Sequence, residues 1–174
     1  MNRLSGLALA TAALLCLTFA PPPNGVRAQQ QKPERSAMTN LAIDLPEVVA
    51  EVKEAYDRYN QAINSNNVAV LDATFRNDAR TIRYGQAENL YGYKEIEAFR
   101  SANRPPAGSP RTLSKTVITT YGRDFAVAST LTHRAGTTGK VGRQMQTWVR
   151  FPEGWRVVAA HVSTIDEPRA ERPQ

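Results

Sequence analysis

One short segment combines a fixed cation with phenols, an amide and an acid. Residues 81–93, TIRYGQAENLYGY, contain one arginine, Arg83, with three tyrosines, one glutamate and two glycines. Arg83 lies in a strand-like run, Thr81–Tyr84, so its side chain either faces solvent at a sheet edge or points inward. An inward guanidinium needs an acid, for which Asp78 and Glu88 are candidates, or an anionic ligand, because burying an unpaired charge is costly. Arginine can hold a carboxylate through two parallel hydrogen bonds, so the inward alternative predicts an anion site.

Tyr59 is the second residue that could do chemistry. Apolar and aromatic residues recur every three or four positions from Leu45 to Ile63, which predicts one buried helix face with Tyr59 on it. A tyrosine there is either a core residue whose hydroxyl finds a backbone partner, or part of a pocket wall. In a pocket, the phenol would donate a proton or a hydrogen bond. Tyr56, one turn earlier, could take either part.

Further candidates lie in two strand-like runs. The run 143–150 alternates, which places one set of side chains on one face: Gln144, Gln146, Trp148 and Arg150. That face could line a polar cavity or cover a dimer interface, and the sequence does not orient it. His161, in a buried-looking strand, is either a core histidine or a base. His133, near a strand end, is expected to be exposed to solvent.

The composition excludes several kinds of site. The net charge is +6, but half of it lies in residues 1–37, and the rest has no Lys/Arg run of the kind that a nucleic-acid surface needs. Cys16 is the only cysteine, so residues 38–174 contain no disulfide, thiolate nucleophile or cysteine-based zinc site. With only two histidines, a multi-histidine metal site is not expected, and we expect no cofactor.

Three helices are predicted before the long strands. Asp44 is expected to cap the first helix, with Pro46 in its first turn and Glu47 completing a capping-box-like pattern. The run Asn64-Ser65-Asn66-Asn67 would end this helix and cap a second one, VAVLDATF. A third is predicted around KEIEAFRSA, stopped by Arg104-Pro105-Pro106.

Four strands are predicted after the helices: TLSKTVITTYG, DFAVASTLTHR, RQMQTWVRF and WRVVAAHVSTI. Turns are expected at 122–124 and 152–154. Helices followed by a strand meander favour an α+β fold with the helices on one face of a curved antiparallel sheet.

The first residues have two interpretations. MNRLSGLALATAALLCLTFA is typical of a secretory signal, whereas Met38 precedes the first structured element and could be the true start, which we slightly favour. We expect 1–37 to be a signal-like leader and linker, 38–166 a single domain and 167–174 a disordered tail. The protein would be cytoplasmic with a start at Met38, and periplasmic or secreted if the 1–28 leader is used. No nucleic acid, and no membrane apart from the leader, is expected as a partner.

Four motifs resemble one family: LPEVVAEV, RYGQAENLYGY, VITTYGRDFA and GRQMQTWVRFPEGWRVVAAHVS. They are similar to the AtzH/HpxZ-type branch of the SnoaL-like proteins, in the nuclear transport factor 2-like superfamily, over about residues 42–165. The resemblance implies a cone-shaped, cystatin-like α+β barrel in which a curved antiparallel sheet wraps around three N-terminal helices. It also implies a homodimer, and a pocket between the helices and the concave face.

The resemblance further implies an activity in nitrogen catabolism. Such proteins act beside amidase-signature hydrolases on ureido compounds, and AtzH-like members convert dicarboxyurea to allophanate. Tyr59 and Arg83 match the catalytic pair of the family. We therefore expect a cofactor-free decarboxylating amidohydrolase acting on an anionic carboxylated urea or a related ureido acid such as oxalurate. Secondary substrate-binding candidates are Tyr84, Asn89, Tyr91, Gln146, Trp148 and His161.

Two features qualify this expectation. Met145 stands where a small polar residue is expected, and an inward Met145 would make the pocket narrower and more apolar and leave the identity of the substrate open. The body also lacks a strong nucleophile, so the protein could instead be a non-catalytic ligand-binding or accessory partner of an amidase-signature hydrolase.

Overall fold

The computed structural model describes residues 41–102 and 110–167. The predictions for the leader, for the helix stop at 104–106 and for most of the tail lie outside these residues. No helix in the two described ranges is long and apolar enough to cross a membrane.

The helices begin and end close to the predicted positions, but the first is entered differently. They are α1 (Pro46–Ser65), α2 (Val68–Thr74) and α3 (Tyr93–Ala102). The prediction that Asp44 caps α1 is wrong. Asp44 has a φ of 55°, and its carboxylate accepts a hydrogen bond of 2.8 Å from the backbone N–H of Thr120. It therefore ties the chain before α1 to the sheet, while Glu47 pairs with Arg123 and forms no capping box.

The link between α1 and α2 is as expected. Asn66 adopts the left-handed conformation that closes α1, and its backbone N–H bonds back to the last turn. The next residue, Asn67, caps α2 by accepting the backbone N–H of Val70 at 3.2 Å. Two consecutive asparagines thus end one helix and start the next.

Six strands form one mixed sheet. They are β1 (Ile82–Tyr84), β2 (Asn89–Tyr91), β3 (Arg111–Tyr121), β4 (Phe125–Arg134), β5 (Lys140–Phe151) and β6 (Gly154–Asp166). Their order is β2-β1-β6-β5-β4-β3, and every pair is antiparallel except β1 with β6. The predicted α+β fold, with a curved sheet around three helices, is confirmed. The sheet is open, its β1–β6 pair is parallel, and the short strand β2 was not predicted.

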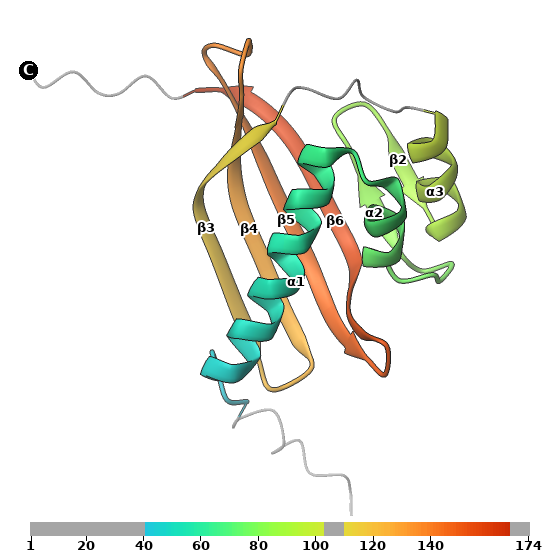
Figure 1. Cartoon of the computed structure of the whole chain (residues 1–174), viewed down its shortest axis with the longest axis vertical. Coiled ribbons are helices and arrows are strands. Elements are labelled where there is room, and N and C mark those ends of the chain that lie inside the picture. Colours follow the sequence, from blue (N-terminus) through green and yellow to red (C-terminus); the bar gives the residue numbers. More distant parts are fainter. Residues whose placement is uncertain (1–40, 103–109, 168–174) are drawn as a thin grey trace, which may run out of the picture. The chain divides into compact units, whose positions relative to one another are not determined.

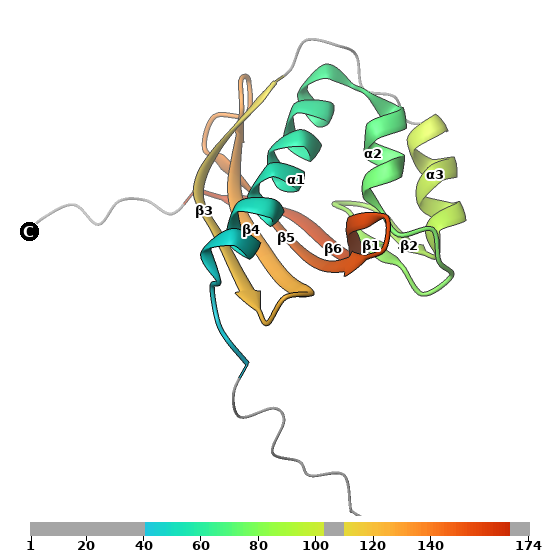
Figure 2. The ribbon, with the colours of Figure 1, turned by 60° about the horizontal axis from the view of Figure 1, so that its bottom comes forward.

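The sheet curves around α1. Figure 2 shows α1 in the hollow of β3–β6, with α2 and α3 beyond it on the side of β1 and β2. Register shifts place an extra residue in β3, between Ser114 and Val117, and in β6, opposite Thr147 and Trp148, and such bulges bend the strands that carry them. The curved sheet leaves its concave face to the helices, as expected.

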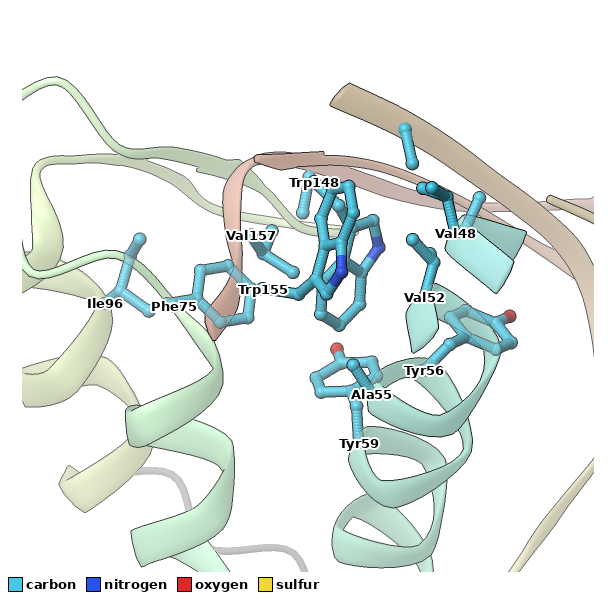
Figure 3. Close-up of a cluster of buried hydrophobic side chains, with 13 residues drawn as sticks. Val48, Val52, Ala55, Tyr56, Tyr59, Phe75, Ile96, Trp148, Trp155 and Val157 are labelled. Carbon is cyan, nitrogen blue, oxygen red and sulfur yellow. The ribbon is translucent and has the colours of Figure 1, made fainter. Parts of the chain in front are cut away.

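Aromatic rings fill the contact between α1 and the sheet. Trp148 of β5 is fully buried, and its ring centroid lies 6.5 Å from that of Tyr56 and 6.4 Å from that of Tyr59. Phe75 extends this cluster to the end of α2, 6.3 Å from the Tyr59 ring. Figure 3 shows Tyr59 projecting from α1 toward Trp148. Edge-to-face pairs such as these add directional packing to the burial of apolar area.

Asn64 provides a testable link between the end of α1 and the start of β3. Its side chain donates to the backbone oxygen of Arg111 at 3.2 Å and accepts from the backbone N–H of Arg111 at 3.0 Å. Asn64→Ala should lower the free energy of unfolding by about 1–2 kcal/mol, because both bonds are lost at a part-buried position. Urea denaturation measures the change. Gln61→Ala, on the exposed face of the same helix, is the control and should change stability by less than about 0.5 kcal/mol. Equal effects would show that the link contributes nothing.

Candidate functional site

A cavity of about 360 Å³ lies beside the C-terminal half of α1. Its walls come from all three helices, the segment 83–88 and the inner face of the sheet. Among the described residues, four arginines line it, Arg83, Arg100, Arg111 and Arg134, against a single acid, Glu88. Tyr59, Gln144 and Phe99 also border it. The residues therefore form a basic pocket with one phenol, which suits a small anion.

Arg83 reaches this pocket because β1 pairs with β6 in parallel. Arg83 lies opposite Ala160, a buried residue of the inner face, so its side chain points to the same side of the sheet. Its guanidinium forms an ion pair with Glu88, and each side chain is 19% exposed. The guanidinium also lies 5.5 Å from the centre of the Phe99 ring. Of the two acids considered, Glu88 is the partner, while Asp78 pairs with Arg80 at 2.7 Å.

Tyr59 belongs to the core and also borders the pocket. It is 6% exposed, and its ring packs against Phe75 and Trp148. Within the described ranges, no group forms a hydrogen bond with its hydroxyl. The two alternatives for Tyr59 are thus compatible, because one face of the ring completes the core while the side chain is also part of the cavity wall. Its catalytic role stays a prediction.

Arg111, the first residue of β3, is a pocket residue that sequence reasoning missed. It is only 7% exposed, and its guanidinium donates to the side-chain oxygens of Gln144 (2.9 Å) and Asn60. Burial lowers the pKa of Arg111 below its ordinary value. An arginine that opens a strand is normally assigned to solvent, and nothing in its immediate sequence marks it otherwise.

Four of the predicted substrate-binding residues do not reach this pocket. Tyr84, Asn89, Tyr91 and His161 lie on the outer face, because their positions alternate with inward-facing neighbours. The hydroxyls of Tyr84 and Tyr91 are 3.4 Å apart, and the Tyr84 ring lies 6.3 Å from that of His161. The expectation that His161 lies in a buried strand position is wrong, since its side chain is exposed.

The alternation predicted for β5 is present, and it settles the direction of Met145. Gln144, Gln146 and Trp148 are buried on the inner face, whereas Met145 is 56% exposed on the outer face. Met145 therefore does not narrow the pocket. Only Gln144 of the inner set borders the cavity, because Gln146 and Trp148 lie deeper in the core. The side-chain amide of Gln146 has no hydrogen-bond partner among the described residues.

The described residues contain no cluster of three or more His, Cys, Asp or Glu side chains suited to a metal ion. Among the described residues that line the pocket, the arginines, the phenol of Tyr59 and the carboxylate of Glu88 are the groups with which its chemistry can be argued.

Comparison with known proteins adds the family. The model of the AtzH-like family matches residues 41–168, which is most of the chain. This chain belongs to the AtzH-like family. No curated protein matches it.

Two solved structures are similar in both sequence and fold. One is a protein of unknown function from Pectobacterium atrosepticum, of the DUF3225 family, with 53% identity and a TM-score of 0.68, covering 73% of this chain and 100% of its own. The other is a cystatin-like fold protein from Burkholderia xenovorans, with 40% identity and a TM-score of 0.69, covering 74% and 100%. A nuclear transport factor 2-like protein from Salmonella enterica, 24% identical with a TM-score of 0.55 over 74% and 98% of the two chains, shares the fold. Family and fold are those of a small enzyme-like or ligand-binding protein.

The pair formed by Arg83 and Glu88 makes a prediction about the charge of the pocket. Glu88→Gln keeps the shape of the side chain but removes the carboxylate that occupies Arg83. Malonate, a small dianion, should therefore bind the variant about two- to tenfold more tightly than the wild type. Isothermal titration calorimetry measures the affinity. Glu153→Gln, which removes the carboxylate from a pair outside the pocket, with Arg76, is the control. Weaker malonate binding after Glu88→Gln would mean that Glu88 orients Arg83 rather than competing for it.

Proposed function

We propose that the protein is a small enzyme of nitrogen catabolism that removes a carboxyl group from an anionic carboxylated urea or a related ureido acid. The observation that supports this proposal is that Tyr59 of α1 and Arg83 of β1, distant in sequence, border the same cavity. The family of the chain supports it as well. The proposed reaction is decarboxylating amide hydrolysis, as in the conversion of dicarboxyurea to allophanate, with oxalurate as a related possible substrate.

Arg83 would fix the substrate by holding a carboxylate through two parallel hydrogen bonds. Because Glu88 occupies the guanidinium in the structure, the substrate carboxylate would replace one anion by another. When the substrate carboxylate replaces Glu88, the guanidinium of Arg83 has a negative partner both before and after the exchange. The exchange also limits binding at Arg83 to ligands whose carboxylate binds this guanidinium better than Glu88 does.

Tyr59 would act as the proton donor, because a phenol is protonated at neutral pH. In dicarboxyurea, the bond between a ureido nitrogen and its carboxylate carbon breaks, and the electrons of that bond move to the nitrogen. Carbon dioxide leaves, the nitrogen takes the phenol proton, and solvent returns a proton to the phenolate. No electron acceptor is needed, so the step is balanced without a redox partner.

A ligand-binding role beside an amidase-signature hydrolase is the second candidate. The Tyr59 hydroxyl lies on the Trp148 side of its ring in Figure 3, and the ring is largely buried, which favours a structural part for this residue. In that case the pocket would hold an anionic ureido compound without changing it.

A homodimer belongs to the proposal. The outer face of the sheet exposes large apolar residues on β3 and β5, Val117 and Met145, which suits contact with a second copy. We place the protein in the cytoplasm if translation starts at Met38.

The proposal is tested by turnover of dicarboxyurea by the purified full chain, followed as carbon dioxide release and allophanate formation. Oxalurate, whose carboxylate is bonded to carbon rather than nitrogen, is assayed separately by its disappearance. Tyr59→Phe should lower kcat about 10²- to 10⁴-fold, since it removes the proton donor and keeps the ring in the core. Arg83→Met should raise KM and lower kcat together.

Tyr121→Phe and Arg123→Met are the matched controls, because both residues lie away from the pocket. Full activity in Tyr59→Phe and Arg83→Met would show that the pair is not catalytic. Absence of turnover by the wild type, together with co-purification of an amidase, would support the binding role instead.

A further inference from the structure

The arginines of the pocket differ in how their charge is compensated. Arg83 is paired with Glu88, and Arg100 is paired with Asp72 at 2.7 Å. Arg111 has only the neutral side-chain oxygens of Asn60 and Gln144, and within the described ranges no carboxylate lies within ion-pair distance of it. Arg111 is therefore a buried cation whose charge the described residues leave uncompensated.

Such an arrangement is costly for stability alone. A buried guanidinium that receives only neutral acceptors loses its hydration without gaining an opposite charge. Amide oxygens compensate part of that loss, but a carboxylate would compensate more. The two bonds of Arg111 use two of the five N–H donors of its guanidinium, and its Nε has no partner among the described residues. Because Nε is itself buried, the donors that remain for a ligand are the second N–H groups of the two terminal nitrogens.

The position of Arg111 is also fixed in advance. Asn64 holds its backbone by two hydrogen bonds, Asn60 holds its guanidinium from α1, and Gln144 holds it from β5. Two elements, α1 and β5, thus orient one charged group of β3 at the wall of the cavity. Fixing a binding group before the ligand arrives reduces the entropy lost on binding.

We infer that Arg111 is the principal anion-binding residue of the pocket, and that it takes a carboxylate of a small organic acid. This inference rests on the proposed function for the use of the pocket, and it adds a residue that no comparison assigns. Arg83 then serves as a second cation that becomes available only when Glu88 leaves it. A ligand with one carboxylate binds at Arg111, and a ligand with two also draws Arg83 from its partner.

A purely structural role is the rival explanation for Arg111. In that case, it only joins α1, β3 and β5 through Asn60 and Gln144. The two explanations differ for Gln144→Glu, which keeps the side-chain shape and places a carboxylate where Arg111 already donates. An internal counter-charge should leave the fold intact while it occupies Arg111. If Arg111 has only a structural role, Gln144→Glu should change the affinity for malonate no more than a negative charge added elsewhere on the protein does.

The experiment measures malonate binding to the full chain by isothermal titration calorimetry, with neutral malonamide as the comparison. The wild type should bind malonate and not malonamide. Arg111→Lys, which keeps the charge but loses the planar fork, and Gln144→Glu should each weaken malonate binding about tenfold or more. Gln144→Glu should retain the thermal midpoint of the wild type, so this test does not depend on whether the Arg111 variant folds.

Gln61→Glu is the matched control, since it adds the same charge on the exposed face of α1 and should change the affinity by less than about twofold. The inference is overturned if malonate binds no better than malonamide, or if Gln144→Glu binds malonate as well as the control does. Turnover is scored separately. Malonate binding that depends on Arg111, without any turnover of dicarboxyurea, would support the anion site and count against the proposed catalysis. Turnover that is the same in Gln144→Glu as in the wild type would support the catalysis and count against the anion site.

Discussion

The packing of α1 against Trp148 is the interaction on which the rest of the structure depends. The first half of α1 fills the hollow of the curved sheet with Val48, Val52 and Tyr56, and Trp148 closes that contact from β5. Beyond Tyr59 the same helix leaves the centre of the sheet and borders the cavity. The helix α1 thus contributes to both the core and the pocket wall, and Tyr59 lies at the boundary between these two parts of the helix. A change that tilted α1 would alter stability and pocket shape together.

The parallel pairing of β1 with β6 is the second constraint. It is short, at three residues, yet it decides which side chains of the segment 82–84 face the pocket. Side chains alternate along a strand, so a slip of one residue would turn Arg83 outward and bring Tyr84 inward. The ion pair with Glu88 on the inner side favours the observed register.

Much of this arrangement could be predicted from residue patterns, and the failures have physical causes. The stripe that contains Tyr59 and the alternation around Gln144 repeat often enough to define helix and strand faces. The strand β2 has three residues, too few for a pattern, so the sequence does not show that Asn89 and Tyr91 face away from the pocket. His161 has apolar neighbours on both sides in sequence, but neighbours in a strand face the opposite way. Arg111 could not be found because its burial depends on Asn60 and Gln144, which approach only in the folded chain.

Glu88 has a further consequence, for selectivity. It lies only five positions from Arg83 in the chain, so it acts as a tethered competitor, present at an effective concentration that short linkers commonly set in the millimolar range. To bind Arg83, a free anion such as chloride, phosphate or acetate must displace Glu88. The free anion loses translational freedom when it binds, whereas the tethered Glu88 loses much less. A ligand that also reaches Arg111 gains a second contact that Glu88 does not oppose. The segment between Arg83 and Glu88 would thus keep abundant simple anions away from Arg83 and hasten the departure of any product that Arg83 alone holds.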